Sequence, residues 1–228
     1  MMPLLFDLTF VLIIPALALA GWAQWRVRSA YSEFSRVRSR GGRRGAEVAA
    51  AILRSNGLGS VRVEAVRGAL TDHYDPKARA VRLSEGNYAS DSIAAVSIAA
   101  HEVGHAIQHG SGYAPLQLRH AIFPVANIGS SLAFPLFFIG FLAQIRPLID
   151  LGILFFAGAV LFSVVTLPVE FNASRRALAQ LRDGSLLSAD EMGGAKKVLD
   201  AAALTYVAAT TMALLQLVRL LLLRGRQD

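Results

Sequence analysis

Apolar positions along the chain form four long runs separated by more polar sequence. The first run extends from Pro3 to Trp25 and contains only three polar residues. At a rise of about 1.5 Å per residue, a helix of this length crosses the hydrocarbon core of a bilayer. A cleaved signal peptide is the alternative, but no Lys or Arg precedes the run and it ends near Trp22 and Trp25 rather than at a small-residue cleavage site. Residues 1–25 are therefore predicted to be a transmembrane anchor.

Two further apolar runs lie close together in the second half of the chain. They cover residues 122–143 and 148–169 and are separated only by Gln144–Pro147. Each run is long enough to cross a bilayer as a helix. Residues 121–169 are therefore predicted to form a transmembrane hairpin.

The last apolar run covers residues 201–223. It continues from polar sequence that opens at Ser188, with Glu191 three residues later in the spacing of a capping box. We favour a transmembrane helix for residues 201–228, because the run is long enough to span. The arginines at its end would then lie outside, against the charge rule for membrane proteins, so packing along the membrane surface or against the hairpin stays open.

Residues 26–120 have the mixed pattern of a small folded domain. Ala46–Arg54 predicts a helix that stops at Asn56–Gly57. Val61–Val66 alternates apolar and charged residues and predicts a half-buried strand, and residues 80–83 predict a second short strand.

The sequence around these strands predicts a turn and a second helix. Thr71–Pro76, between the strands, is typical of a turn. Ser92–His109 is rich in alanine and isoleucine and predicts a helix that Ser90 or Asp91 can cap. An exposed edge of the small sheet could pair with an extended peptide, or the sheet could serve only to pack against the helix.

Composition places this pattern in a membrane. Hydrophobic residues make up 54% of the 228 residues, more than an ordinary soluble domain contains. Lys and Arg outnumber Asp and Glu by 23 to 16, and the basic residues flank the apolar runs. This distribution indicates membrane lipid, and no nucleic acid, as a partner. The positive-inside rule then places the N-terminus outside and the following domain in the cytoplasm.

The predicted helix 92–109 carries His101, Glu102 and His105 in an HExxH motif. Residues four apart lie on one helix face, so the two histidines can present their imidazoles to one metal ion. Glu102 is rotated by about 100° from His101 and can reach a water on that ion as a general base. The chain has no cysteine, so any metal must be held by His, Asp or Glu. The pattern predicts a Zn2+ site, although these ligand types also accept manganese or cobalt.

A catalytic zinc takes three protein ligands and leaves one position for water. His109 lies eight residues after His101, about 12 Å along a straight helix, which is too far to share an ion bound at about 2 Å. His120 opens an apolar run and is expected at the membrane interface. His73 lies in the predicted turn and is expected at the surface, although it could stabilise an oxyanion.

The better candidate for the third ligand is Glu170, directly after the predicted hairpin. Two crossings return the chain to the side of His101 and His105, whichever side is cytoplasmic. A glutamate at the end of a very apolar segment is costly unless it has a partner, and a zinc ion would be one. The alternative is a salt bridge to Arg175 or exposure at the membrane surface. Ser174, one turn later, could orient a ligand or bond to its own helix backbone.

With these residues in view, the chain resembles the membrane-anchored neutral zinc metallopeptidases of bacteria, the YugP-like group. The resemblance covers almost the whole chain. It rests on the N-terminal anchor and on four segments: Leu70–Pro76, Leu83–Tyr88, Ile98–His109 and Pro168–Ser174. It implies a multi-pass protein of the bacterial inner membrane. We expect an α+β, mainly α-helical fold with a small zincin-like domain, and the positive-inside rule places its active site on the cytoplasmic side.

The resemblance also implies the roles of the site residues. His101 and His105 would be zinc ligands, Glu102 the general base, and Glu170 the third ligand, on a helix and connecting segment of residues 170–200. The chain is more distantly similar to the HtpX-like and CAAX prenyl endopeptidases, which also place transmembrane helices between the two-histidine motif and a glutamate ligand. In that distant group an aspartate usually follows this glutamate by four residues, whereas Ser174 holds the position here.

The sequence therefore predicts a membrane-embedded zinc-dependent endopeptidase. It would hydrolyse peptide bonds in protein or peptide substrates by a zinc-activated water, with Glu102 as base. One alternative is an intramembrane protease of the site-2 type, but residues 92–109 carry a Glu and three His, and Asp183–Gly184 lies in a polar stretch. The other is a non-catalytic metal-binding membrane scaffold, which would have no need of Glu102.

Overall fold

The computed structural model describes residues 8–225, and these residues form a mainly helical structure with one small sheet. The predicted α+β, mainly α-helical fold class is confirmed. The elements in chain order are η1 (Leu8–Ile13), α1 (Ile14–Phe34), α2 (Gly45–Ser55), β1 (Arg62–Val66), β2 (His73–Asp75), β3 (Ala80–Ser84), α3 (Glu85–Ala89), α4 (Ile93–Gly110), α5 (Ala114–Ala143), α6 (Arg146–Asp183) and α7 (Met192–Arg224).

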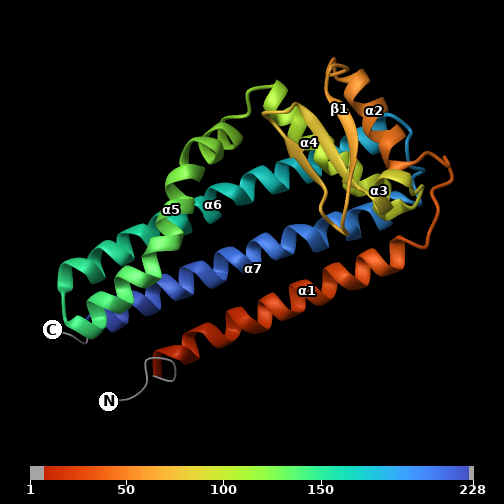
Figure 1. The fold of residues 1–228 in the computed structure, drawn as a ribbon. Helices are drawn as coiled ribbons and strands as arrows, with labels where there is room; N and C mark the ends of the chain where they lie inside the picture. Colours follow the sequence, from red (N-terminus) through yellow and green to blue (C-terminus); the bar gives the residue numbers. More distant parts are fainter. Residues whose placement is uncertain (1–7, 226–228) are drawn as a thin grey trace. The chain divides into compact units, whose positions relative to one another are not determined.

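The described residues form two compact units. The helical unit combines the chain up to Ala23 with Gln117–Leu167 and the residues from Thr205 onward. The sheet unit combines Gln24–Leu116 with Pro168–Leu204. Figure 1 shows that the sheet unit holds the three strands and the short helices, whereas the helical unit consists of long helices.

Within residues 8–225, four helices are long and apolar enough to cross a membrane, by length and composition. They are Thr9–Phe34, α5, α6 and α7. The first continues past Trp25 to Phe34, so Arg26 and Arg28 lie on the helix rather than after it. Only Gln144 and Ile145 separate α5 from α6. Aromatic and aliphatic side chains of α5, α6 and α7 form the core of the helical unit, among them Phe137, Phe156 and Leu220.

The sheet unit has its own hydrophobic core, centred on α4. α4 contributes Val96, Ala99 and Val103, and α2 packs against it. The sheet has the strand order β1-β3-β2, in which β1 and β3 are parallel and β2 is antiparallel to β3. α4 contacts β2 and β3, and Figure 1 shows the strands beside this helix.

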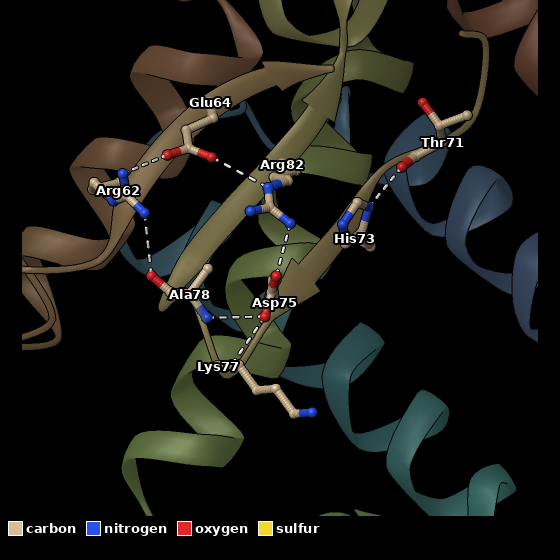
Figure 2. Close-up of polar contacts among 8 residues, drawn as sticks. All are labelled: Arg62, Glu64, Thr71, His73, Asp75, Lys77, Ala78 and Arg82. Atoms are coloured by element: carbon tan, nitrogen blue, oxygen red, sulfur yellow. Dashed lines mark hydrogen bonds and ion pairs between the residues drawn. The ribbon is translucent and has the colours of Figure 1, made fainter. Parts of the chain in front are cut away.

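The prediction of a turn at Thr71–Pro76 was wrong, because His73–Asp75 form strand β2. The turn lies just after it, where the Asp75 carboxylate accepts hydrogen bonds from the backbone N–H groups of Lys77 and Ala78, at 2.9 and 3.0 Å. Figure 2 shows that Arg82, on the central strand β3, pairs with Asp75 at 2.7 Å and with Glu64 on β1 at 3.2 Å. A three-residue strand is stabilised by such cross-strand contacts rather than by local propensity, so it leaves little pattern in the sequence.

Two predicted helix starts need adjustment. The N-cap of α4 is Ser92, whose Oγ accepts a hydrogen bond from the Ala95 N–H at 3.2 Å, and not Ser90 or Asp91. Asp91 is held instead by Arg38, at 2.6 Å. Of the predicted capping box, the Ser188 N–H donates to the Glu191 carboxylate at 2.7 Å, but the Ser188 hydroxyl donates to the same carboxylate at 2.6 Å instead of accepting from the Glu191 N–H. Both contacts precede α7, which begins at Met192.

The feature that positions the site is a very close approach of α4 to α6. A Cβ atom added at Gly104 on α4 would lie 2.6 Å from the carbonyl oxygen of Ala173 on α6. Contacts below 3.0 Å do not occur for real Cβ atoms, so the absence of a side chain at Gly104 permits this separation. The separation in turn brings residues on either side of Gly104 within reach of the neighbouring turns of α6.

Replacing Gly104 with Ala is expected to destabilise the metal-free protein. In an open helix the same change stabilises by about 1 kcal/mol. Here the methyl group would meet backbone that cannot rotate away, and overpacking of this kind costs about 1–3 kcal/mol. Thermal unfolding in detergent with a chelator present should therefore show a lower Tm for Gly104→Ala.

Gly193→Ala on α7 is the matched control, because its added Cβ would meet nothing within 4 Å. It should leave the Tm unchanged or raise it slightly. If Gly104→Ala raised the Tm as much as the control, the close approach of α4 and α6 would not be a real constraint.

Candidate metal centre

His101 and His105 lie one turn apart on α4, and both rings face Glu170 on α6. Their ring centroids are 4.8 Å apart and the rings are nearly perpendicular, at 87°. Nε2 of His101 lies 3.3 Å from Oε2 of Glu170, and Nε2 of His105 lies 3.5 Å from the same oxygen. The structure thus brings together three side chains that are separated by up to 69 residues in the sequence.

The separations between the Glu170 oxygen and the two imidazole nitrogens fit a tetrahedral zinc ion. Bonds of about 2.0–2.1 Å in tetrahedral geometry place two ligand atoms about 3.3 Å apart. The observed separations of 3.3 and 3.5 Å match that value. Among the described residues 8–225, the ligand atoms of His101, His105 and Glu170 all lie within 4.8 Å of one another, close enough to share one metal ion. Two nitrogens and one carboxylate oxygen also form a donor set that zinc accepts.

Glu102 lies beside this group without belonging to it. It is a buried residue of α4. Its position directly after His101 rotates its side chain by about 100° around the helix, away from the face that meets Glu170. A carboxylate in that place is adjacent to the two imidazoles and is not engaged as a third ligand.

The other nitrogen of each imidazole has a neutral partner. Nδ1 of His101 lies 3.1 Å from Oγ of Ser174, one turn after Glu170 on α6. Nδ1 of His105 lies 3.0 Å from Oε1 of Gln108. The interpretation of Ser174 as a residue that orients a ligand agrees with this contact, whereas Gln108 was missed in the sequence. Its position three residues after His105, on the same helix face, was the available signal.

Burial and neighbouring charge shift the pKa of His105 in opposite directions. Burial acts to lower the pKa of His105, but its contact with Glu170 and the charge of Glu102 outweigh burial, so the pKa lies above the ordinary value. Glu170 itself is only 2% exposed, and its carboxylate faces the two imidazoles. A metal ion ligated by His105 would compete with protons for this imidazole.

The remaining histidines lie outside the group. Nδ1 of His109 lies 2.8 Å from the hydroxyl of Tyr74 on β2, so this side chain contacts the sheet rather than Glu170. His73 is exposed, and its Nδ1 lies 2.9 Å from the backbone carbonyl oxygen of Thr71 (Figure 2). His120 is an exposed residue of α5. A role of His73 toward an oxyanion stays a prediction.

Comparison with known proteins also indicates a zinc metallopeptidase. Residues 9–225 match the family model described as "Putative neutral zinc metallopeptidase". The chain is 51% identical, over 219 residues, to a protein of Bacillus subtilis (strain 168) described as "Putative membrane protease YugP"; the match covers 95% of this chain and 97% of that protein. No solved structure matches the chain. The resemblance found in the sequence is confirmed, and the chain belongs to the neutral zinc metallopeptidase family of that description.

Proposed function

We propose that this membrane protein is a zinc-dependent endopeptidase in which His101, His105 and Glu170 hold the zinc ion. The observation that carries the proposal is the convergence of three ligand atoms, from two helices, at the spacing of a tetrahedral site. Membership of the family and the four helices of membrane-spanning length support the coarser statement of a membrane protease.

Zinc at this site would supply Lewis acidity, which polarises a peptide carbonyl and lowers the pKa of a water molecule. Glu102 accepts a proton from that water as its oxygen bonds to the carbonyl carbon. The same carboxylic acid then gives the proton to the amide nitrogen as the carbon–nitrogen bond breaks. Glu170 and the two histidines would hold the ion through both steps, since Glu170 is buried and the histidines are half-buried where α4 meets α6.

The location of α4 favours a site outside the bilayer over an intramembrane one. α4 is not among the described helices that are long and apolar enough to cross a membrane, and it packs against β2, β3 and α2. β2 is an edge strand of the sheet and contacts α4. We propose that an extended peptide adds to this edge, which would place its backbone along the metal-binding helix.

We also propose that the protein resides in the bacterial inner membrane with the sheet unit in the cytoplasm. The proposal is supported by the arginines that follow the first apolar run, beginning with Arg26 and Arg28.

Removal of a ligand is expected to abolish tight zinc binding. Loss of a residue that merely supports a ligand weakens metal affinity about 10–100-fold, so His105→Ala or Glu170→Ala should weaken it by more than that. Zinc content of the detergent-purified protein, together with competition against a chelator, measures the effect.

His109→Ala is the control for this experiment. His109 lies one turn further along α4 and contacts Tyr74 instead of Glu170, so the variant should bind zinc like the wild type. Equal zinc affinity in Glu170→Ala and His109→Ala would show that the third ligand is a residue other than Glu170.

Replacement of the base is expected to separate turnover from metal binding. Glu102→Gln keeps the size of the side chain and removes its ability to accept a proton, which should lower the rate of peptide cleavage about 100- to 10,000-fold. Zinc content should remain that of the wild type. Cleavage of a mixed peptide library, with products identified by mass spectrometry, provides the measurement without a known substrate.

A non-catalytic scaffold makes a different prediction for the same experiment. Wild-type protein with a full complement of zinc would then cleave no peptide in the library, and Glu102→Gln would be indistinguishable from it. That result would contradict the proposed peptidase activity and leave the metal site standing.

A further inference from the structure

Gln108 connects the two helices that carry the proposed ligands. It lies on α4, its side chain is fully buried at 0% exposure, and all its polar atoms have partners. Its Nε2 lies 2.8 Å from the Val169 carbonyl oxygen and 3.0 Å from Oδ1 of Asn172, both on α6. Its Oε1 lies 3.0 Å from Nδ1 of His105.

The chemistry of these partners leaves one orientation for each amide. A backbone carbonyl oxygen only accepts, so the Gln108 atom that faces Val169 must be the amide nitrogen. Nε of Arg176 lies 2.7 Å from Oδ1 of Asn172, and a guanidinium only donates and stays charged. The Asn172 atom between Arg176 and Gln108 must therefore be oxygen, which again requires nitrogen on the Gln108 side.

With both hydrogens of its amide nitrogen given to α6, Gln108 has only its oxygen left for His105. That oxygen accepts a hydrogen bond, so His105 must carry a proton on Nδ1. In the neutral imidazole the lone pair is then on Nε2, the atom 3.5 Å from Glu170. His101 is held differently, because the Ser174 hydroxyl can either donate or accept and imposes no such direction.

The far end of this chain of hydrogen bonds is anchored on the same helices. The Arg176 guanidinium lies over the ring of Tyr113, at 5.9 Å from its centroid. The Tyr113 hydroxyl donates to the carbonyl oxygen of Pro168 at 3.4 Å. Contacts to Pro168, Val169 and Asn172 thus lie on both sides of Glu170 along α6.

We propose that Arg176, Asn172 and Gln108 form a hydrogen-bond relay in which Arg176 and Gln108 both donate to Oδ1 of Asn172, and Gln108 accepts from His105. This relay sets the tautomer of His105 and presents its Nε2 lone pair to the metal. The three are positioning residues, acting on the ion only through His105. The proposal rests on the proposed function to the extent that His105 must be a metal ligand.

Two substitutions that each add one carboxylate test the relay. Asn172→Asp keeps an oxygen that accepts from Gln108 and Arg176, so the donors and acceptors of the relay are unchanged and zinc affinity should stay within a few-fold of the wild type. Gln108→Glu has at most one hydrogen for the two acceptors on α6, whether ionised or protonated, and leaves at least one of them unpaired. An ionised carboxylate at position 108 would be repelled by the two acceptors on α6, the Val169 carbonyl oxygen and Oδ1 of Asn172, and should leave its place beside Nδ1 of His105. Zinc affinity should then fall about 10–100-fold, the usual loss when a partner of a ligating histidine is removed.

Three measurements separate positioning from packing: zinc affinity by chelator competition, the Tm of the metal-free protein, and the visible absorption of the cobalt-substituted protein. Gln180→Leu is the structural control, because it removes another interhelix amide contact of α6, from Nδ2 of Asn56 to Oε1 of Gln180 at 2.7 Å. It should lower the Tm and leave zinc affinity and the cobalt spectrum unchanged. Gln108→Glu should lower zinc affinity and alter the cobalt spectrum. If Gln108→Glu does not fold, Gln108→Met is used in its place, because it keeps the volume of the side chain and removes all of its hydrogen bonds.

The relay is overturned if the Gln108 variant binds zinc as tightly as the wild type. It is also overturned if Asn172→Asp loses as much affinity as Gln108→Glu, or if the affinity losses merely follow the Tm as they would for loosened packing. Full zinc binding by His105→Ala would instead contradict the proposed metal site itself, and so distinguishes the two failures.

Discussion

The contact between α4 and α6 at Gly104 and Ala173 is the constraint on which the rest of the site depends. Two helix backbones meet there with no room for a Cβ atom. Only at that separation does the Glu170 carboxylate lie 3.3 and 3.5 Å from the two imidazoles of α4. The hydrogen bonds of Gln108 to α6 require the same separation. A wider spacing would break the proposed metal centre and its supporting contacts together.

The burial of Glu170 also becomes understandable from this arrangement. An ionised carboxylate at 2% exposure is strongly disfavoured unless positive charge or hydrogen-bond donors compensate for lost water. Two imidazoles, and a cation bound between them and the carboxylate, would provide that compensation. The side chains that contact the other nitrogen of each imidazole, Ser174 and Gln108, are neutral and add no further negative charge. A +2 ion with two neutral ligands and one carboxylate would keep a net positive charge at the site, which favours polarisation of a carbonyl.

The grouping of these three side chains could be predicted largely because its signals are local. The four-residue spacing of His101 and His105 predicts a shared helix face. Glu170 is conspicuous because it is an acidic residue at the end of an apolar run. Strand β2 could not be predicted in the same way, since its three residues are stabilised by pairing with β3 and by Arg82. The role of Gln108 was equally hidden. It depends on the Val169 carbonyl oxygen, which lies 61 residues away in the sequence and only 2.8 Å away in space.

The most direct test of the metal centre is X-ray absorption at the zinc edge on the purified, zinc-loaded protein. The structure predicts a four-coordinate ion with two imidazole nitrogens and two oxygens, one from Glu170 and one from water, at about 2.0–2.2 Å. Imidazole contributes a recognisable multiple-scattering pattern, so the number of histidines can be determined. A spectrum with one histidine or none, or six oxygen neighbours, would contradict the account of zinc held between α4 and α6.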